Sequence, residues 1–180
     1  GSVGTRRMIY GQDKEDGLIV MGVANLSRFQ YSPDPELRHS LGIPETACML
    51  VYAGTLHPTR KTETLLLAAR HLMQDSNCPD FRLVIIGEGA DAARQRALAA
   101  EYGVGERVLF LGRVLFDKMP SYYSVADIGV GYVTNSPEYG PQPPLKTVEM
   151  LGCGLPVVAT DTEGDRIFVT DVVNVLLVED

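Results

Sequence analysis

The sequence predicts an α/β fold in which helices cover both faces of a doubly wound, mostly parallel sheet. Short, continuous apolar runs alternate along the chain with longer segments whose apolar residues recur at helical spacing. Continuous apolar runs are typical of strands that are buried on both faces. Because parallel strands need crossover connections, and these are right-handed, the alternation indicates one sheet between two layers of helices.

The first elements follow from their boundaries. A short strand is expected at residues 18–23, after a polar lead-in, and a helix at 35–41, which Gly42 closes. Residues 48–53 form an apolar run bounded by glycine and predict a buried strand. The next segment, 62–74, predicts a helix because its apolar residues share one face: Leu65, Leu66, Ala69 and Leu72.

The same unit of strand and helix repeats toward the C-terminus. The remaining strands are expected at 82–87, 107–112, 128–132, 156–159 and 174–178. Between them, helices are expected up to about residue 102, at 117–126, and from Pro143-Pro144 to about residue 153.

Composition excludes several classes of protein. The 180 residues fit one domain, and the hydrophobic fraction of 45% and charged fraction of 22% are those of a globular chain. A net charge of −7 argues against nucleic acid as the main partner. Three scattered cysteines favour a reducing cytoplasm, and neither a membrane-spanning run nor a signal peptide is visible.

Two loops at the carboxyl ends of the strands, where ligands bind in such sheets, are unusual. In loop 54–61, Arg60 and Lys61 precede a helix whose free N–H groups would help bind a phosphate; two solvated cations are the simpler alternative. His57 lies in the same loop and is a residue to test. Loop 134–144 contains four prolines and Glu138, and its length makes it a candidate binding loop.

Two further patterns have both a chemical and a structural interpretation. Residues 87–92 match the dinucleotide-binding pattern with Ala92 in the third position, but the glycines also fit a close backbone approach or a turn. Lys146 and Glu149 share a helix face, as a surface ion pair would. Since apolar residues surround them, the carboxylate of Glu149 needs a partner, and a pair of sugar hydroxyls would serve.

Several stretches, in order and spacing, resemble the C-terminal, donor-binding domain of retaining GT-B glycosyltransferases of family 4 (group 1). They are 22–29, 50–61, 83–89, 108–112, 119–127 and the most specific one, 144–159 with Pro144-Leu145-Lys146, Glu149 and Gly154-Leu155-Pro156. The resemblance covers nearly the whole chain and implies a Rossmann-like half of a GT-B fold. It is to the Pro-x-Lys-x-x-Glu branch, because Pro141 stands where many members carry a sugar-binding glutamate, and whether Glu138 replaces that residue is open.

The resemblance implies roles for individual residues. Arg60 and Lys61 would neutralise the diphosphate of a nucleotide sugar as the catalytic cations, Glu149 would bind the ribose, and the backbone near Val114 and Leu115 would meet the base. Positioned cations and helix N–H groups stabilise a departing diphosphate, so no metal and no cofactor is expected. The implied donor-binding set is Gly54, Thr55, Gly87, Gly89, Val114, Leu115, Pro144, Leu145, Lys146, Thr147 and Glu149.

The resemblance also implies what residues 1–180 would lack. The acceptor domain of such enzymes precedes this domain, so the isolated chain is expected to bind a UDP-, GDP- or ADP-linked sugar without turning it over. The whole enzyme would be a cytoplasmic hexosyltransferase of polysaccharide biosynthesis, brought to the inner membrane face, if at all, by the missing domain. The alternatives are a non-catalytic nucleotide- or NAD-binding module and a GT-B nucleotide-sugar epimerase.

Overall fold

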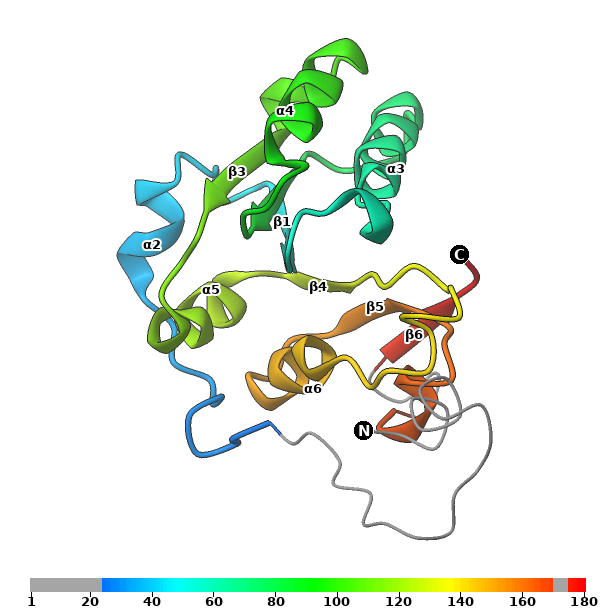
Figure 1. Ribbon diagram of the computed structural model, residues 1–180. Coiled ribbons are helices and arrows are strands. Elements are labelled where there is room, and N and C mark those ends of the chain that lie inside the picture. Colours follow the sequence, from blue (N-terminus) through cyan, green and yellow to red (C-terminus); the bar gives the residue numbers. More distant parts are fainter. Residues whose placement is uncertain (1–23, 170–174) are drawn as a thin grey trace, which may run out of the picture.

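The computed structural model describes residues 24–169 and 175–180, so the strand expected at 18–23 lies outside the described residues. A six-stranded parallel sheet in the order β3-β2-β1-β4-β5-β6 forms the centre of the fold (Figure 1). This is the strand order of doubly wound nucleotide-binding folds. The strands are β1 Cys48–Ala53, β2 Phe81–Ile86, β3 Val108–Gly112, β4 Ile128–Gly131, β5 Val157–Thr160 and β6 Val175–Val178.

Helices cover both faces of the sheet, as the sequence predicts. Figure 1 shows α3 and α4 on one side and α2, α5 and α6 on the other. Successive residues of β1 point to opposite faces, and both are buried: Val51 packs in the core under α5 and α6, and Tyr52 in the core under α3. The helices are α2 Pro35–Ser40, α3 Glu63–Gln74, α4 Ala92–Glu101, α5 Met119–Val125 and α6 Leu145–Gly152.

The ends of the helices follow from local chemistry. The Asp34 side chain accepts a hydrogen bond of 3.1 Å from the Glu36 N–H and caps α2, which ends before Gly42 at φ 67°. The helix expected at 117–126 begins as a 3-10 turn, Phe116–Lys118, and continues as α5 with Pro120 in its first turn. Proline has no N–H to donate, which costs little in that first turn.

The strand order reverses between β1 and β4, which opens a crevice at the carboxyl edge of the sheet. The loops after β1 and β2 lie against each other there: the Gly54 N–H donates to the Ile86 carbonyl oxygen (2.9 Å), and the Leu56 N–H to that of Glu88 (3.0 Å). A Cβ atom at Gly87, where φ is 142°, would lie 1.9 Å from the Gly54 carbonyl oxygen. The glycine is therefore required for this backbone contact.

Candidate functional site

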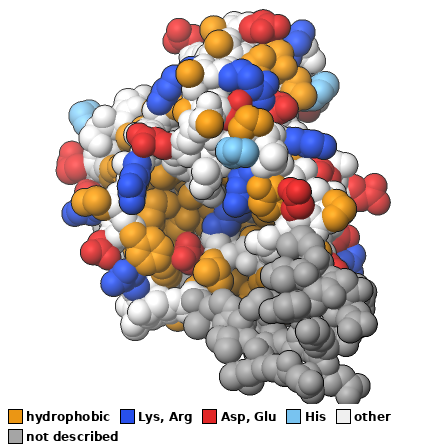
Figure 2. Space-filling model, in the orientation of Figure 1, with side chains coloured by type: hydrophobic (Ala, Val, Ile, Leu, Met, Phe, Trp, Pro, Cys, Tyr) orange, Lys and Arg blue, Asp and Glu red, His pale blue; other side chains and the backbone are white. Residues whose placement is uncertain are grey.

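A cavity of about 710 Å³ lies at the carboxyl ends of β1, β2 and β3, between their loops and the helices α5 and α6. Figure 2 shows this side of the molecule, with hydrophobic side chains exposed between separate acidic and basic groups. The volume is that of a pocket for a ligand of nucleotide size. Its lining includes Gly54, Thr55, Gly87, Glu88, Gly89, Arg113, Val114, Leu115, Tyr123, Lys146 and Glu149.

The structure brings most of the predicted donor-binding residues together, although they come from loops far apart in the sequence. Three of the predicted residues on α6 and its cap lie outside the lining. Pro144 is the N-cap of α6, Leu145 is 38% exposed, and the buried Thr147 hydroxyl donates to Asp165 Oδ1 (3.2 Å). The cavity wall from this helix consists of Lys146 and Glu149.

Lys146 is held by an aromatic ring and a carbonyl group. Its Nζ lies 4.2 Å from the ring centroid of Tyr52 and donates to the Tyr132 carbonyl oxygen. Burial lowers the pKa of Lys146 to about 7, with Arg60 contributing in the same direction and Asp165 opposing it. None of the ion pairs among residues 24–169 and 175–180 joins Lys146 to Glu149, so the simple surface pair is not what the structure shows.

Glu149 is half-buried in the same wall, and burial raises its pKa. The buried Tyr123, on α5, lines the cavity near it: burial, and secondarily the charge of Glu149, raise the pKa of this tyrosine. Glu149 forms no ion pair with any of the residues that the structure describes. A carboxylate in such a wall can accept two hydrogen bonds from vicinal hydroxyl groups of a ligand.

Arg60 and Lys61 do not point to one place, although they are adjacent in the sequence. Arg60 ends a 3-10 turn, Pro58–Arg60, and its Cζ lies 4.6 Å from the ring centroid of Tyr139. Lys61 is exposed and adopts φ 48°, the left-handed conformation, before α3 begins. Neither residue lines the 710 Å³ cavity. Arg60 nevertheless lies close enough to Lys146 to lower its pKa.

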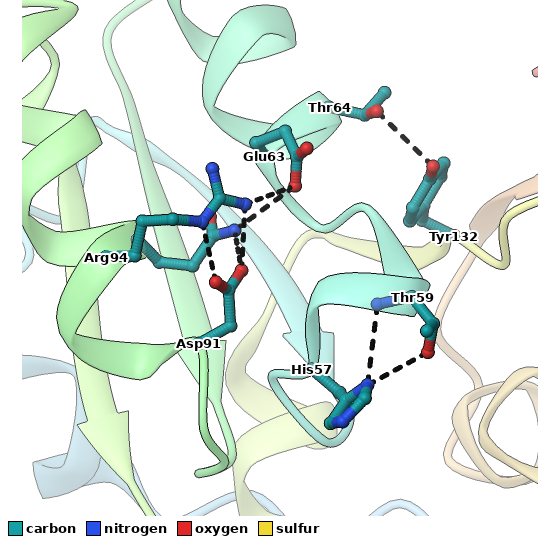
Figure 3. A network of polar contacts seen from close by, with 8 residues as sticks. His57, Thr59, Glu63, Thr64, Asp91, Arg94 and Tyr132 are labelled. Carbon is teal, nitrogen blue, oxygen red and sulfur yellow. Dashed lines mark hydrogen bonds and ion pairs between the residues drawn. The ribbon is translucent and has the colours of Figure 1, made fainter.

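Two polar clusters near this edge include residues that the sequence did not single out (Figure 3). His57 Nδ1 lies 2.9 Å from Thr59 Oγ1, which lies 2.8 Å from the hydroxyl of Tyr139. In the second cluster, Arg94 Nε donates to Asp91 Oδ1 (2.6 Å), and the guanidinium also reaches Glu63 of α3 (3.0 Å).

The Asp91 cluster fixes the loop that carries Gly87 and Gly89. Asp91 is 2% exposed, and the hydrogen bond from Arg94 lowers its pKa. Its backbone N–H donates to the Leu56 carbonyl oxygen (3.1 Å). A helix start after a glycine pair was the signal that could have pointed to Asp91, whereas no sequence signal marks Tyr139.

Other predicted features lie away from the cavity. Glu138 is exposed outside the lining, and its carbonyl oxygen accepts a hydrogen bond from Gln142 Nε2.

Within the described residues, no group of three or more His, Cys, Asp or Glu side chains could hold a metal ion. In that same part of the chain, no helix is both long and apolar enough to cross a membrane.

Comparison with known proteins identifies the family. The model of the family "Glycosyl transferases group 1" matches residues 47–180. The chain belongs to this family. A D-inositol 3-phosphate glycosyltransferase of Geodermatophilus obscurus is 32% identical over 177 residues, which cover 94% of this chain and 38% of that protein. The chain thus spans well under half the length of this relative.

Solved structures confirm that this chain has the fold of one Rossmann-like domain of a GT-B enzyme. HepE of Anabaena in complex with UDP-glucose superposes with a TM-score of 0.79 at 22% identity, covering 98% of this chain and 47% of HepE. The C-terminal domain of the group 1 glycosyltransferase LpcC from Francisella tularensis superposes with a TM-score of 0.68 at 20% identity, covering 87% of this chain and 80% of the LpcC chain. The sequence-based prediction of a group 1 glycosyltransferase with a Rossmann-like fold is therefore confirmed for both family and fold.

Proposed function

We propose that this chain is the donor-binding domain of a retaining glycosyltransferase that transfers a hexose from a nucleotide-diphospho-sugar to a glycan, lipid-linked or small-molecule acceptor. The observation that carries the proposal is that one wall of a nucleotide-sized cavity presents both a cation, Lys146, and a carboxylate, Glu149. The cavity lies at the topological switch point, where doubly wound sheets bind ligands. The complex of HepE with UDP-glucose supports a uridine nucleotide as the first candidate, before GDP and ADP.

The two groups suit different parts of the same ligand. Lys146, with Arg60 close by, would act on the diphosphate, where negative charge develops as its bond to the sugar breaks. Glu149 would accept hydrogen bonds from the ribose hydroxyls, and Val114 and Leu115, in the loop after β3, would meet the base. Fixed cations and backbone N–H groups can stabilise this charge directly, so we propose a reaction without a metal or a cofactor.

The acceptor would be bound by another part of the protein. The chain covers 38% of the Geodermatophilus relative, which supports a second, acceptor-binding domain in the whole enzyme. We therefore propose that residues 1–180 alone bind the donor without turning it over. The cysteines, Cys48, Cys78 and Cys153, are free thiols, which supports a cytoplasmic enzyme.

Calorimetric titration of the chain with UDP, GDP, ADP and NAD tests the proposal. We expect one nucleoside diphosphate to bind and NAD not to bind. Replacing Glu149 by Gln removes a charged acceptor of hydrogen bonds, which is worth about 1.5–3 kcal/mol, or roughly a 10- to 150-fold loss of affinity. Glu88→Gln is the matched control, because Glu88 is an exposed carboxylate of the same cavity, in the loop after β2.

The 2′-deoxy form of the bound nucleotide separates the ribose role from a general effect of charge. The wild-type chain should bind the deoxy form more weakly than the ribo form, and this difference should be smaller in Glu149→Gln, whose amide oxygen is a weaker, uncharged acceptor. A preference for the ribo form that is as large in Glu149→Gln as in the wild type would refute the assignment of Glu149. Absence of binding by all three diphosphates, or binding of NAD alone, would refute the proposed function.

A further inference from the structure

The side chain of Tyr139, in loop 134–144, contacts the loop after β1 in two ways. Its hydroxyl lies 2.8 Å from Thr59 Oγ1, and the Cζ of Arg60 lies 4.6 Å from its ring centroid. The hydroxyl of Tyr139 thus contacts Thr59 while its ring contacts the adjacent residue, Arg60. Thr59 is in turn fixed by His57, whose Nδ1 lies 2.9 Å from Thr59 Oγ1 (Figure 3).

The packing around Arg60 leaves its guanidinium little freedom. Tyr139 and Arg60 join Tyr52 and Tyr132 around a void that has no room for a water molecule. A planar guanidinium on an aromatic face is a favourable cation–π arrangement. Tyr139 therefore selects one conformation of a side chain that would otherwise have many.

In this conformation the positive charge of Arg60 lies near the cavity. Tyr52, which packs beside Arg60, also lies 4.2 Å below Nζ of Lys146, a residue of the cavity wall. Burial is the main cause of both pKa shifts, lowering the pKa of Lys146 and raising that of Tyr52, and Arg60 acts on both in the lowering direction, as a nearby cation does. Neither Arg60 nor Lys146 has an acidic partner among the ion pairs of residues 24–169 and 175–180. Two like charges held together in this way suit a ligand with more than one negative charge.

We propose that Tyr139 is a positioning residue, whose ring holds the Arg60 guanidinium beside Lys146 so that both cations act on the phosphates of the ligand. The inference rests on the proposed function, because it takes the ligand to be a nucleoside diphosphate. A cation that is ordered before the ligand arrives loses less conformational entropy on binding. The contribution of Tyr139 should thus depend on the phosphates and not on the nucleoside.

Binding of two ligands by three variants tests this inference. The ligands are the nucleoside diphosphate that the wild-type chain binds best among UDP, GDP and ADP, and the corresponding nucleoside without phosphates. Tyr139→Leu removes the ring, whereas Tyr139→Phe keeps it and removes the hydroxyl. Tyr102→Leu is the matched control, because Arg70 lies over the Tyr102 ring at 5.9 Å, and neither residue lines the cavity.

We expect Tyr139→Leu to weaken binding of the diphosphate about two- to fivefold, the factor that a cation–π contact of modest strength supplies. Binding of the nucleoside should not change. The affinity of Tyr139→Phe for the diphosphate should stay within about twofold of the wild-type affinity, and the affinity of Tyr102→Leu should equal that of the wild type. In proton NMR spectra of the free protein, the Arg60 δ protons should shift upfield in the wild type and in Tyr139→Phe, and lose this ring-current shift in Tyr139→Leu.

The outcomes separate the inference from the function on which it rests. If the wild-type chain binds a diphosphate and Tyr139→Leu binds it equally well, the positioning role is refuted and the proposed function stands. Equal losses for diphosphate and nucleoside would also refute it, because they would show that Tyr139 only shapes the loop. If the wild-type chain binds no nucleotide, the proposed function fails, and the inference fails with it. Thermal melting of each variant confirms that it is folded.

Discussion

The low pKa of Lys146 predicts that the affinity of the chain for a nucleoside diphosphate falls as the pH rises above 7. Burial, aided by Arg60, lowers the pKa of this amine to about 7 in the free protein, with Asp165 opposing. A bound diphosphate favours the charged form and so raises the pKa of Lys146. Between the free and the bound pKa, binding takes up one proton, and affinity falls by up to about tenfold for each pH unit.

Titration at pH 7 to 9 measures this slope directly, because the diphosphate itself is fully ionised above its second pKa of about 6. Lys146→Met removes the titrating amine, so its affinity should be lower at pH 7 and nearly constant up to pH 9. Lys118→Met is the control, because Lys118 is exposed and lies outside the cavity lining. A slope in Lys146→Met as steep as in the wild type would show that another group takes up the proton, and would refute the assignment.

Two predictions concern stability and are read from chemical denaturation. Gly87→Ala should lose more free energy of unfolding than Gly103→Ala. At Gly103 (φ 71°) a Cβ would have no atom within 4 Å, so alanine costs only the strain of a left-handed backbone, about 1–2 kcal/mol. At Gly87 the Cβ would also lie 1.9 Å from the Gly54 carbonyl oxygen, and this clash should cost roughly 1–3 kcal/mol more. Equal losses would contradict the close approach of the two loops. Lys61→Gly should raise the free energy of unfolding by about 0.5–1 kcal/mol, because the backbone at φ 48° suits glycine; a decrease would mean that the Lys61 side chain stabilises the fold.

The sequence predicted the fold because the signals for strands and helices are local. The run at residues 48–53 coincides with β1, Cys48–Ala53, and the helix expected at 62–74 with α3, Glu63–Gln74. Apolar runs indicate strands that are buried on both faces, and helical periodicity indicates helices that are buried on one face. Few arrangements of strands and helices bury all of these faces at once. The exceptions are short: the helix expected at 117 begins instead as a 3-10 turn, which periodicity does not distinguish from α-helix.

The sequence predicted part of the cavity lining, but not the geometry of the candidate site. The strand ends placed Gly54 and Gly87 at one edge, because parallel strands all end there, and the helix start after loop 134–144 placed Glu149 beside them. The direction of Arg60 was not predictable, because it depends on the left-handed backbone of Lys61 and on a ring 80 positions away in sequence from Thr59. Such contacts between loops have no periodic signal. Their residues, Tyr139 above all, emerge only from the folded chain.

The amide chemical shifts of the chain during titration with UDP, GDP and ADP test the central claim, that the cavity between β1, β2 and α6 binds the donor nucleotide. With the base that binds, we predict shifts at Gly54, Gly87, Val114 and Glu149, which line the cavity, and none at Gly103, which follows the C-cap of α4 and does not line the cavity. Saturable shifts confined to residues outside that lining, or no shifts with any of the three nucleotides at millimolar concentration, would contradict the account.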